Sequence, residues 1–196
     1  MARPREFDPD TVMDRAMGVF WEHGYVGASL PDLLDGMGLT RGSFYKAFKG
    51  KKQLFLAALD RYYDEEVVPG ITLLKDAEQG SGATRIKQVF GAIPAAVERG
   101  DERGCLLCSA ASGRAMRDDD IARVIHRQLG AFEGGFESAL ADSDTAQGTA
   151  RLLVSQYMGM RAMARGGVSA ETLQESVAAL DALLSPHKAP DQRERA

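Results

Sequence analysis

The segment from Gly38 to Phe55, GLTRGSFYKAFKGKKQLF, combines a glycine turn, a short helical pattern and a run of positive charge. Five cationic side chains lie between Arg41 and Lys52, with no acidic residue among them. The chain as a whole is acidic, with a formal net charge of -4 over 196 residues. A local cationic segment in an acidic protein is typical of a small nucleic-acid-binding unit joined to a body with another role.

A supporting helix is predicted before this segment. Asp8 and Pro9 have the pattern of an N-cap followed by proline at the first helical position. Apolar residues then recur at helical spacing as far as His23-Gly24, where the glycine closes the segment. This spacing predicts a first helix of about four turns.

Two short helices follow, separated by a glycine-rich turn at residues 36–38. Ser29, with an acidic residue three positions later, resembles the capping box that starts a helix. Thr40 is placed to cap a third helix from Arg41 to about Phe48. Helix, glycine turn and helix at these lengths indicate a helix-turn-helix.

The third predicted helix presents short polar and cationic groups at its N-terminal end, where a recognition helix reaches base edges. Lys49, Lys51 and Lys52 surround the glycine at position 50. There, backbone N–H groups and ammonium groups are expected to hold one phosphate. The alternative interpretation is a solvated basic loop, because charge runs are often solvated faces.

Residues from about Arg3 to Tyr62 resemble the DNA-binding head of the TetR/AcrR family of bacterial transcriptional repressors. The resemblance is carried by RPREFD and by AMGVFWEHGYVGASLPDLLDGMGLTRGSFYKAFKGKKQLF. These stretches contain an aromatic-rich end of the first helix, a Gly-Tyr turn, a capped second helix, a Gly-Leu turn and the pattern Ser-Phe-Tyr-x-x-Phe-x-x-Lys. The resemblance covers about a third of the chain.

This resemblance implies an all-α fold with an N-terminal three-helix helix-turn-helix head and a larger C-terminal helical domain for ligand binding and dimerisation. The expected boundaries are 5–65 for the head, 66–187 for the effector-binding and dimerisation domain, and 188–196 for a disordered tail. Tyr45 and Lys51 are expected to touch phosphates. The full set of residues expected at the DNA is Arg5, Ser29, Thr40, Arg41, Gly42, Ser43, Tyr45, Lys46 and Lys51.

The remainder of the chain has helical patterns nearly to its end. A long helix after position 50 links head and body, and Pro69-Gly70 is expected to kink or end it. The further expected helices are Thr84 to Glu98, Cys105 to Ala111, Asp118 to Leu140, Thr145 to Arg165 and Ser169 to Leu184.

The family resemblance implies that the last two long helices pair with their copies in a second subunit as a four-helix bundle. A palindromic operator requires two heads about one helical turn apart, which favours a homodimer. Interface candidates are Leu152, Leu153, Tyr157 and Leu180. The alternative is that these apolar side chains form only the core of their own subunit.

Cys105 and Cys108 lie three positions apart, on one face of a predicted helix. One interpretation is that both are small hydrophobic residues that pack a core. The other is a thiol sensor, because Arg103 and a helix N-terminus near Cys105 lower a thiol pKa. The segment GCLL also resembles that of a TetR subgroup, some of whose members respond to electrophiles or oxidants.

The sequence shows no pattern typical of an enzyme active site, a cofactor site or a metal site. A glycine-rich phosphate loop is absent, and the three histidines lack metal-ligand spacing. A dyad of Cys105 with His126 is the strongest catalytic alternative. The start MARPREFDPD turns acidic where a signal peptide is apolar, and no run of about 18 apolar residues occurs, so a cytoplasmic protein outside the membrane is expected.

These patterns together predict a DNA-binding transcriptional regulator, a repressor with double-stranded operator DNA as its partner. It is expected to leave a palindromic operator when an unidentified small molecule binds or a cysteine is modified. Two alternatives from other classes are a Cys105-dependent enzyme and a helical interaction protein whose head does not bind DNA.

Overall fold

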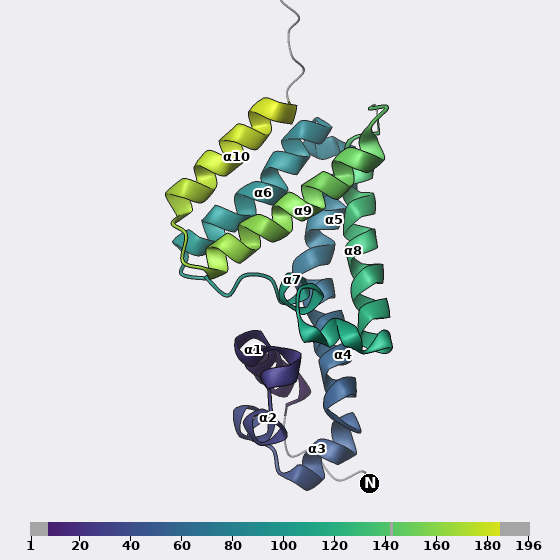
Figure 1. Ribbon diagram of the computed structural model, residues 1–196, viewed down its shortest axis with the longest axis vertical. Coiled ribbons are helices and arrows are strands. Elements are labelled where there is room, and N and C mark those ends of the chain that lie inside the picture. The colour runs from purple at the N-terminus through teal and green to yellow at the C-terminus, as the bar shows by residue number, and fades with distance from the viewer. Residues whose placement is uncertain (1–7, 142, 185–196) are drawn as a thin grey trace, which may run out of the picture.

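The structure is a computed structural model that describes residues 8–141 and 143–184, and its regular elements within these ranges are all helical (Figure 1). The α-helices are α1 (Pro9–Gly27), α2 (Leu30–Met37), α3 (Arg41–Phe48), α4 (Lys51–Tyr62), α5 (Val68–Lys75), α6 (Gly82–Glu98), α7 (Leu106–Ala111), α8 (Asp119–Ala139), α9 (Ala146–Arg165) and α10 (Ala170–Leu184). A π-helical turn, η1 (Tyr63–Val67), joins α4 to α5, and the 3-10 turns η2 (Ala77–Gln79) and η3 (Arg114–Arg117) precede α6 and α8. The predicted all-α class is confirmed.

The head consists of α1, α2 and α3 packed against the first part of α4, at the lower end of Figure 1. Asp8 caps α1 by accepting the N–H of Thr11 at 3.3 Å, as predicted. Gly24 interrupts the helical geometry with φ 67, a conformation that glycine adopts without steric cost. The rings of Phe20 and Phe55 meet edge to face at 4.8 Å in the core of the head. The chain therefore folds the head around aromatic side chains from α1 and α4.

One nearly continuous helical segment connects head and body, because α4 passes through η1 into α5 (Figure 1). In η1 the N–H of Val68 donates to the carbonyl of Tyr63, five residues earlier. This turn places Pro69 in the first turn of α5, a position where proline is tolerated. Pro69-Gly70 therefore does not end the helical segment. The domain boundary that we predicted at residue 65 falls within η1.

The body is a helical bundle in which α8 packs against α5 and α9, and α10 packs against α6. Its core contains Phe90, Phe132, Phe136 and Tyr157, and the ring of Tyr157 lies 4.9 Å from that of Phe132 and 5.8 Å from that of Phe90. The predicted helices occur within two residues of their expected ends. Helix α6 begins earlier than expected, because Ser81 caps it by accepting the N–H of Thr84 at 3.1 Å.

Among residues 8–141 and 143–184, none of the helices has the length and apolar character needed to cross a membrane. The predicted disordered tail, 188–196, lies outside the described residues.

Candidate DNA-binding surface and effector cavity

Two side-chain caps define the helix-turn-helix. The Ser29 hydroxyl accepts the N–H of Asp32 at 3.3 Å, and the Asp32 carboxylate accepts the N–H of Ser29 at 2.8 Å, which completes a capping box. Gly38 ends α2 in the left-handed conformation, with φ 67. Thr40 then starts α3, because its hydroxyl accepts the N–H of Ser43 at 3.2 Å. The capping roles predicted for Ser29 and Thr40 are confirmed.

The outer face of α3 carries groups suited to nucleic acid. Arg41, Tyr45 and Lys46 are exposed, and Tyr45 has 48% of its surface accessible although it is a large aromatic residue. Neither Arg41 nor Lys46 forms an ion pair with a residue in the described part of the chain. A Cβ added at Gly42 would meet no atom within 4 Å, so this end of α3 stands clear of the protein. Arg5 lies outside the described residues.

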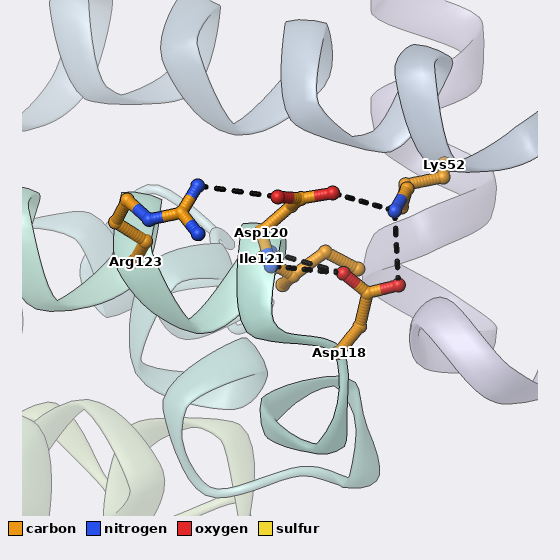
Figure 2. A network of polar contacts seen from close by, with 5 residues as sticks. All are labelled: Lys52, Asp118, Asp120, Ile121 and Arg123. Carbon is orange, nitrogen blue, oxygen red and sulfur yellow. Dashed lines mark hydrogen bonds and ion pairs between the residues drawn. The ribbon is translucent and has the colours of Figure 1, made fainter.

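The two lysines at the start of α4 differ in their surroundings. The Lys51 ammonium lies 3.4 Å from the carbonyl of Val26 and 5.0 Å from the centre of the Tyr25 ring. Partial burial lowers the pKa of Lys51. Lys52 instead forms ion pairs with Asp118 and Asp120 of the body (Figure 2). The Lys52 ammonium, which was expected to join Lys49 and Lys51 around a phosphate, therefore faces two carboxylates of the body.

A cavity of about 260 Å³ lies in the body between the linking segment and helices α6, α7, α8 and α9. Its size is close to the lower end of the range for small-molecule sites. The walls are mainly apolar, with a few polar groups, and include Val89, Leu107, Leu129, Phe132, Tyr157, Cys105 and Cys108. The body therefore has a cavity near the size of a small ligand, with both cysteines among its lining residues.

The loop before α7 places Cys105 at the helix N-terminus. Gly104 has φ 77, and a Cβ there would approach the Arg161 carbonyl to 3.0 Å. The guanidinium of Arg161 donates to the carbonyl of Gly104, so α9 holds this loop in place. Cys105 is the N-cap of α7, and its sulfur accepts the N–H of Cys108 at 3.4 Å. The predicted start of this helix shifts by one residue, and Cys105 has extended rather than helical backbone.

The pKa values of the two buried thiols are shifted in opposite directions. Hydrogen bonds from the Cys108 thiol, the Tyr62 hydroxyl and the Cys108 N–H, with the positive charge of Arg161, lower the pKa of Cys105 to about 6 despite its burial. The bond that Cys108 gives to Cys105, together with burial, raises the pKa of Cys108 well above its ordinary value. Cys105 is therefore the more acidic thiol of this pair.

The thiol pair is also close to the head. Tyr62 contacts the Trp21 indole of α1 edge to face, with ring centres 5.1 Å apart. The Trp21 carbonyl accepts a hydrogen bond from Arg165 of α9 at 2.8 Å, and the Arg103 guanidinium lies 4.3 Å from the centre of the indole. A second cavity of about 630 Å³, between the end of α1 and helices α7 and α9, is also lined by Cys105 and Cys108. The two cysteines thus lie between the cavity of about 260 Å³ and the contact between head and body.

Four residues predicted at a subunit interface have different positions. Leu152 is 68% exposed on α9, whereas its neighbour Leu153 is 2% exposed inside the subunit. Tyr157 packs between Phe90 and Phe132 and lines the cavity of about 260 Å³. Leu153 and Tyr157 are therefore packed within their own subunit, and their place in an interface stays a prediction. Leu180 is half-buried on α10.

The structure does not bring together the groups of the catalytic alternative. His126 is exposed on α8 and lines neither of the two cavities that Cys105 lines. Within residues 8–141 and 143–184, no three His, Cys, Asp or Glu side chains are grouped so that they could hold a metal ion.

Several residues of this site were not found by sequence reasoning. Arg161 and Arg165 belong to no sequence motif, and their positions on α9 look like those of ordinary surface cations. Their partners, Gly104 and Trp21, lie 57 and 144 positions earlier in the chain. Only Gly104 gives a local signal, as a glycine before the apolar helix.

Comparisons with known proteins agree with this architecture. Residues 12–58 match the model of the family described as bacterial regulatory proteins, tetR family. The chain is similar to the HTH-type transcriptional regulator YezE of Bacillus subtilis (strain 168), with 32% identity over 141 residues, covering 71% of this chain and 72% of YezE. It is also similar to the HTH-type transcriptional repressor ComR of Escherichia coli (strain K12), with 30% identity over 184 residues, covering 88% of this chain and 87% of ComR.

Among solved structures, the fold is similar to that of a cysteine mutant of the TetR family transcriptional regulator CifR. That structure contains 26-bp double-strand operator DNA. The TM-score is 0.83 with 28% sequence identity, and the match covers 93% of this chain and 100% of the CifR chain.

Proposed function

The chain belongs to the TetR family and is a DNA-binding transcriptional regulator, and we propose that it is a cytoplasmic, homodimeric repressor without catalytic activity. Its head binds a palindromic double-stranded operator. Release follows when a small molecule occupies the body cavity or when Cys105 is modified. The alternatives of an enzyme and of a DNA-inactive interaction protein are less well supported. Within residues 8–141 and 143–184 the exposed cations of α3 have no ion-pair partner, and His126 lines neither cavity that Cys105 lines.

The observation that carries DNA binding is the exposed face of a capped recognition helix. Arg41 and Lys46 have no carboxylate partner in the described part of the chain, and Tyr45 is exposed beside them. We assign Arg41 and Lys46 to base edges in the major groove, with Thr40, Gly42 and Ser43 near it, and we assign Tyr45 and Lys51 to phosphates. The 26-bp double-strand operator DNA bound to CifR supports this choice of partner.

The observation that supports a dimer is the outer face of α9 and α10. Leu152, Met163 and Leu183 are 68%, 39% and 77% exposed, although they are large and apolar. Small residues on the same two helices, Gly159, Ala162 and Ala179, are exposed as well and would allow close helix approach. We therefore assign the interface to this exposed face of α9 and α10.

The observation that supports thiol sensing is the position of Cys105 in the wall of the cavity, at a helix N-terminus and with a lowered pKa. A small electrophile in the cavity would therefore meet a thiolate, which is the nucleophilic form of cysteine. Modification would act as a switch only if the modified protein prefers a head arrangement that does not fit the operator. A ligand that binds the cavity without reacting would act by the same preference.

Footprinting of the DNA that flanks the gene of this protein tests the proposed function directly. A protected palindrome is the expected result. Binding to this DNA without any protected site would favour a head that is not sequence-specific, and absence of all binding would favour a DNA-inactive head.

Lys51→Ala is expected to weaken binding to the protected site and to a random duplex about equally. It should also lower the slope of log affinity against log salt by about one unit, because one phosphate contact is lost. Fluorescence anisotropy titrations at several salt concentrations measure both quantities. Lys75→Ala is the control, since Lys75 is exposed on α5 in the body and should change neither.

Arg41→Ala and Lys46→Ala are expected to change base preference instead. Each should relax discrimination at a defined half-site position by about 1–3 kcal/mol. Binding to a panel of single-base operator variants measures this change. Uniform weakening across the panel would assign the residue to the phosphates.

A further inference from the structure

The first turns of α4 and α8 meet through a compact ion-pair cluster (Figure 2). The Lys52 ammonium lies 2.7 Å from Oδ2 of Asp120 and 3.4 Å from Oδ2 of Asp118. Arg123 approaches the other oxygen of Asp120, with Nη1 at 3.1 Å from Oδ1. Oδ1 of Asp118 accepts the N–H groups of Asp120 at 3.1 Å and Ile121 at 3.3 Å, so it also caps α8. Both carboxylates are therefore bonded on both oxygens.

The cluster is balanced in charge, because two carboxylates face one ammonium and one guanidinium. The hydrogen bond to Asp120 raises the pKa of Lys52, and the bonds from Lys52 and Arg123 lower the pKa of Asp120. The Lys52 side chain is 33% exposed, which makes it the least exposed cation of this cluster. The two carboxylates therefore neutralise the Lys52 ammonium and compete with a phosphate for it.

The position of Lys52 in the chain places this cluster between the recognition helix and α8. Lys52 follows the last residue of the recognition helix, Phe48, by four positions, and α3 packs on α4. On the other side, Ile121 is fully buried and anchors the first turn of α8. Two turns further along, Leu129 of the same helix lines the cavity of about 260 Å³. Helix α8 thus reaches from the cavity wall to Lys52, four positions beyond the end of the recognition helix.

We propose that Lys52 is a positioning residue, whose ion pairs with Asp118 and Asp120 fix the recognition helix to α8, and that it does not contact the DNA backbone. A displacement of α8 at the cavity would then reach the head directly through this cluster. The proposal rests on the operator binding proposed above, and it assigns to Lys52 a different role from that of its neighbour Lys51.

The test compares Lys52→Gln, Asp120→Asn and the double variant by anisotropy titration with the protected operator duplex. A positioning role predicts weaker binding for both variants, about two- to fivefold, with Asp120→Asn no larger in effect than Lys52→Gln, because it breaks one of the two pairs that Lys52→Gln breaks. The double variant should shift no further than Lys52→Gln. The salt slope should stay at the wild-type value, and Lys52→Arg should restore wild-type affinity.

Asp119→Asn is the matched control, because Asp119 is exposed in the same turn of α8 and makes none of these contacts. It removes the same charge and should leave affinity unchanged. A phosphate contact at Lys52 predicts opposite signs: weaker binding with a salt slope lower by about one unit for Lys52→Gln, and tighter binding for Asp120→Asn. That pattern, or no change in any variant, would overturn the proposal.

Hydrogen exchange of the free protein separates this proposal from the proposed function. Both Lys52→Gln and Asp120→Asn should raise exchange in the first turns of α4 and α8 together, whereas Asp119→Asn should not. A wild-type protein that binds no duplex would contradict the proposed function, yet this measurement would still decide whether Lys52 positions the head. Unchanged exchange in both turns would overturn the positioning role.

Discussion

Leu152→Glu should convert the protein from a dimer to a monomer and lower its affinity for the operator by about 100-fold or more. Leu152 is 68% exposed on α9, and Leu183 is 77% exposed on α10. A carboxylate in the proposed interface would be buried without a partner, which costs about 3–5 kcal/mol. The two heads then no longer span half-sites one helical turn apart. Sedimentation velocity and operator titration measure the two effects.

The adjacent residue provides a matched control with the opposite expected outcome. Leu153 is 2% exposed, so Leu153→Glu places a charge inside the subunit and should abolish the cooperative thermal transition. Circular dichroism should show that Leu152→Glu, in contrast, keeps its helical signal and its melting transition. If Leu152→Glu sedimented as an unchanged dimer, the exposed face of α9 would not be the interface.

Cys105→Ser should abolish the release from operator DNA that N-ethylmaleimide causes in the wild-type protein. The thiolate adds to the maleimide alkene and forms a carbon–sulfur bond, while the neighbouring carbon takes a proton from water. Serine does not react under these conditions, yet its hydroxyl is a good N-cap, so α7 should keep its start. The anisotropy of a labelled operator duplex, with mass spectrometry of the protein, follows release and modification together.

The reaction should depend on pH with a low midpoint. Because the pKa of Cys105 is lowered to about 6, its thiolate is present above that pH and is lost as the pH falls below it. Alkylation of Cys105 should therefore be nearly independent of pH from about 7 to 8 and slow markedly at pH 5. An ordinary thiol, with a pKa of about 8.5, would instead react faster as the pH rises through this range.

Variants of Cys108 test the cause of this shift. Cys108→Ala removes the hydrogen bond that lowers the pKa of Cys105 most, so the midpoint of alkylation should move upward. Cys108→Ser keeps a donor at the same place and should retain a low midpoint. If the wild-type midpoint lay at or above about 8.5 and operator binding resisted electrophiles, both cysteines would be core packing only.

The head was predictable because its signals are local. Each signal involves groups within four positions of one another: the cap at Thr40, the capping box at Ser29, and the break at Gly24. Such contacts form inside single turns, so residue type and spacing specify them without knowledge of the rest of the fold. The same applies to the ends of α6, α8 and α9, which lie within two residues of their predicted positions.

The faces of the body helices were not predictable in the same way. Helix α9 has apolar residues on more than one side, and Leu152 and Leu153 have the same chemistry in adjacent positions. Periodicity showed that this helix is amphipathic, but it did not show which side meets α6 and α8. Packing around Phe90 and Phe132 decides that Leu153 and Tyr157 belong to the core and that Leu152 remains outside.

Residue type and spacing were enough to predict the all-α fold, the helix-turn-helix and the cationic character of α3. They could not predict that Lys52 pairs with Asp118 and Asp120, that Arg161 holds Gly104, or that Tyr62 lies between a thiol and the head. The difference lies in the sequence distance across which each contact forms. Caps form within one turn of chain, whereas Lys52 and Asp120 are 68 positions apart and meet only when α4 and α8 pack.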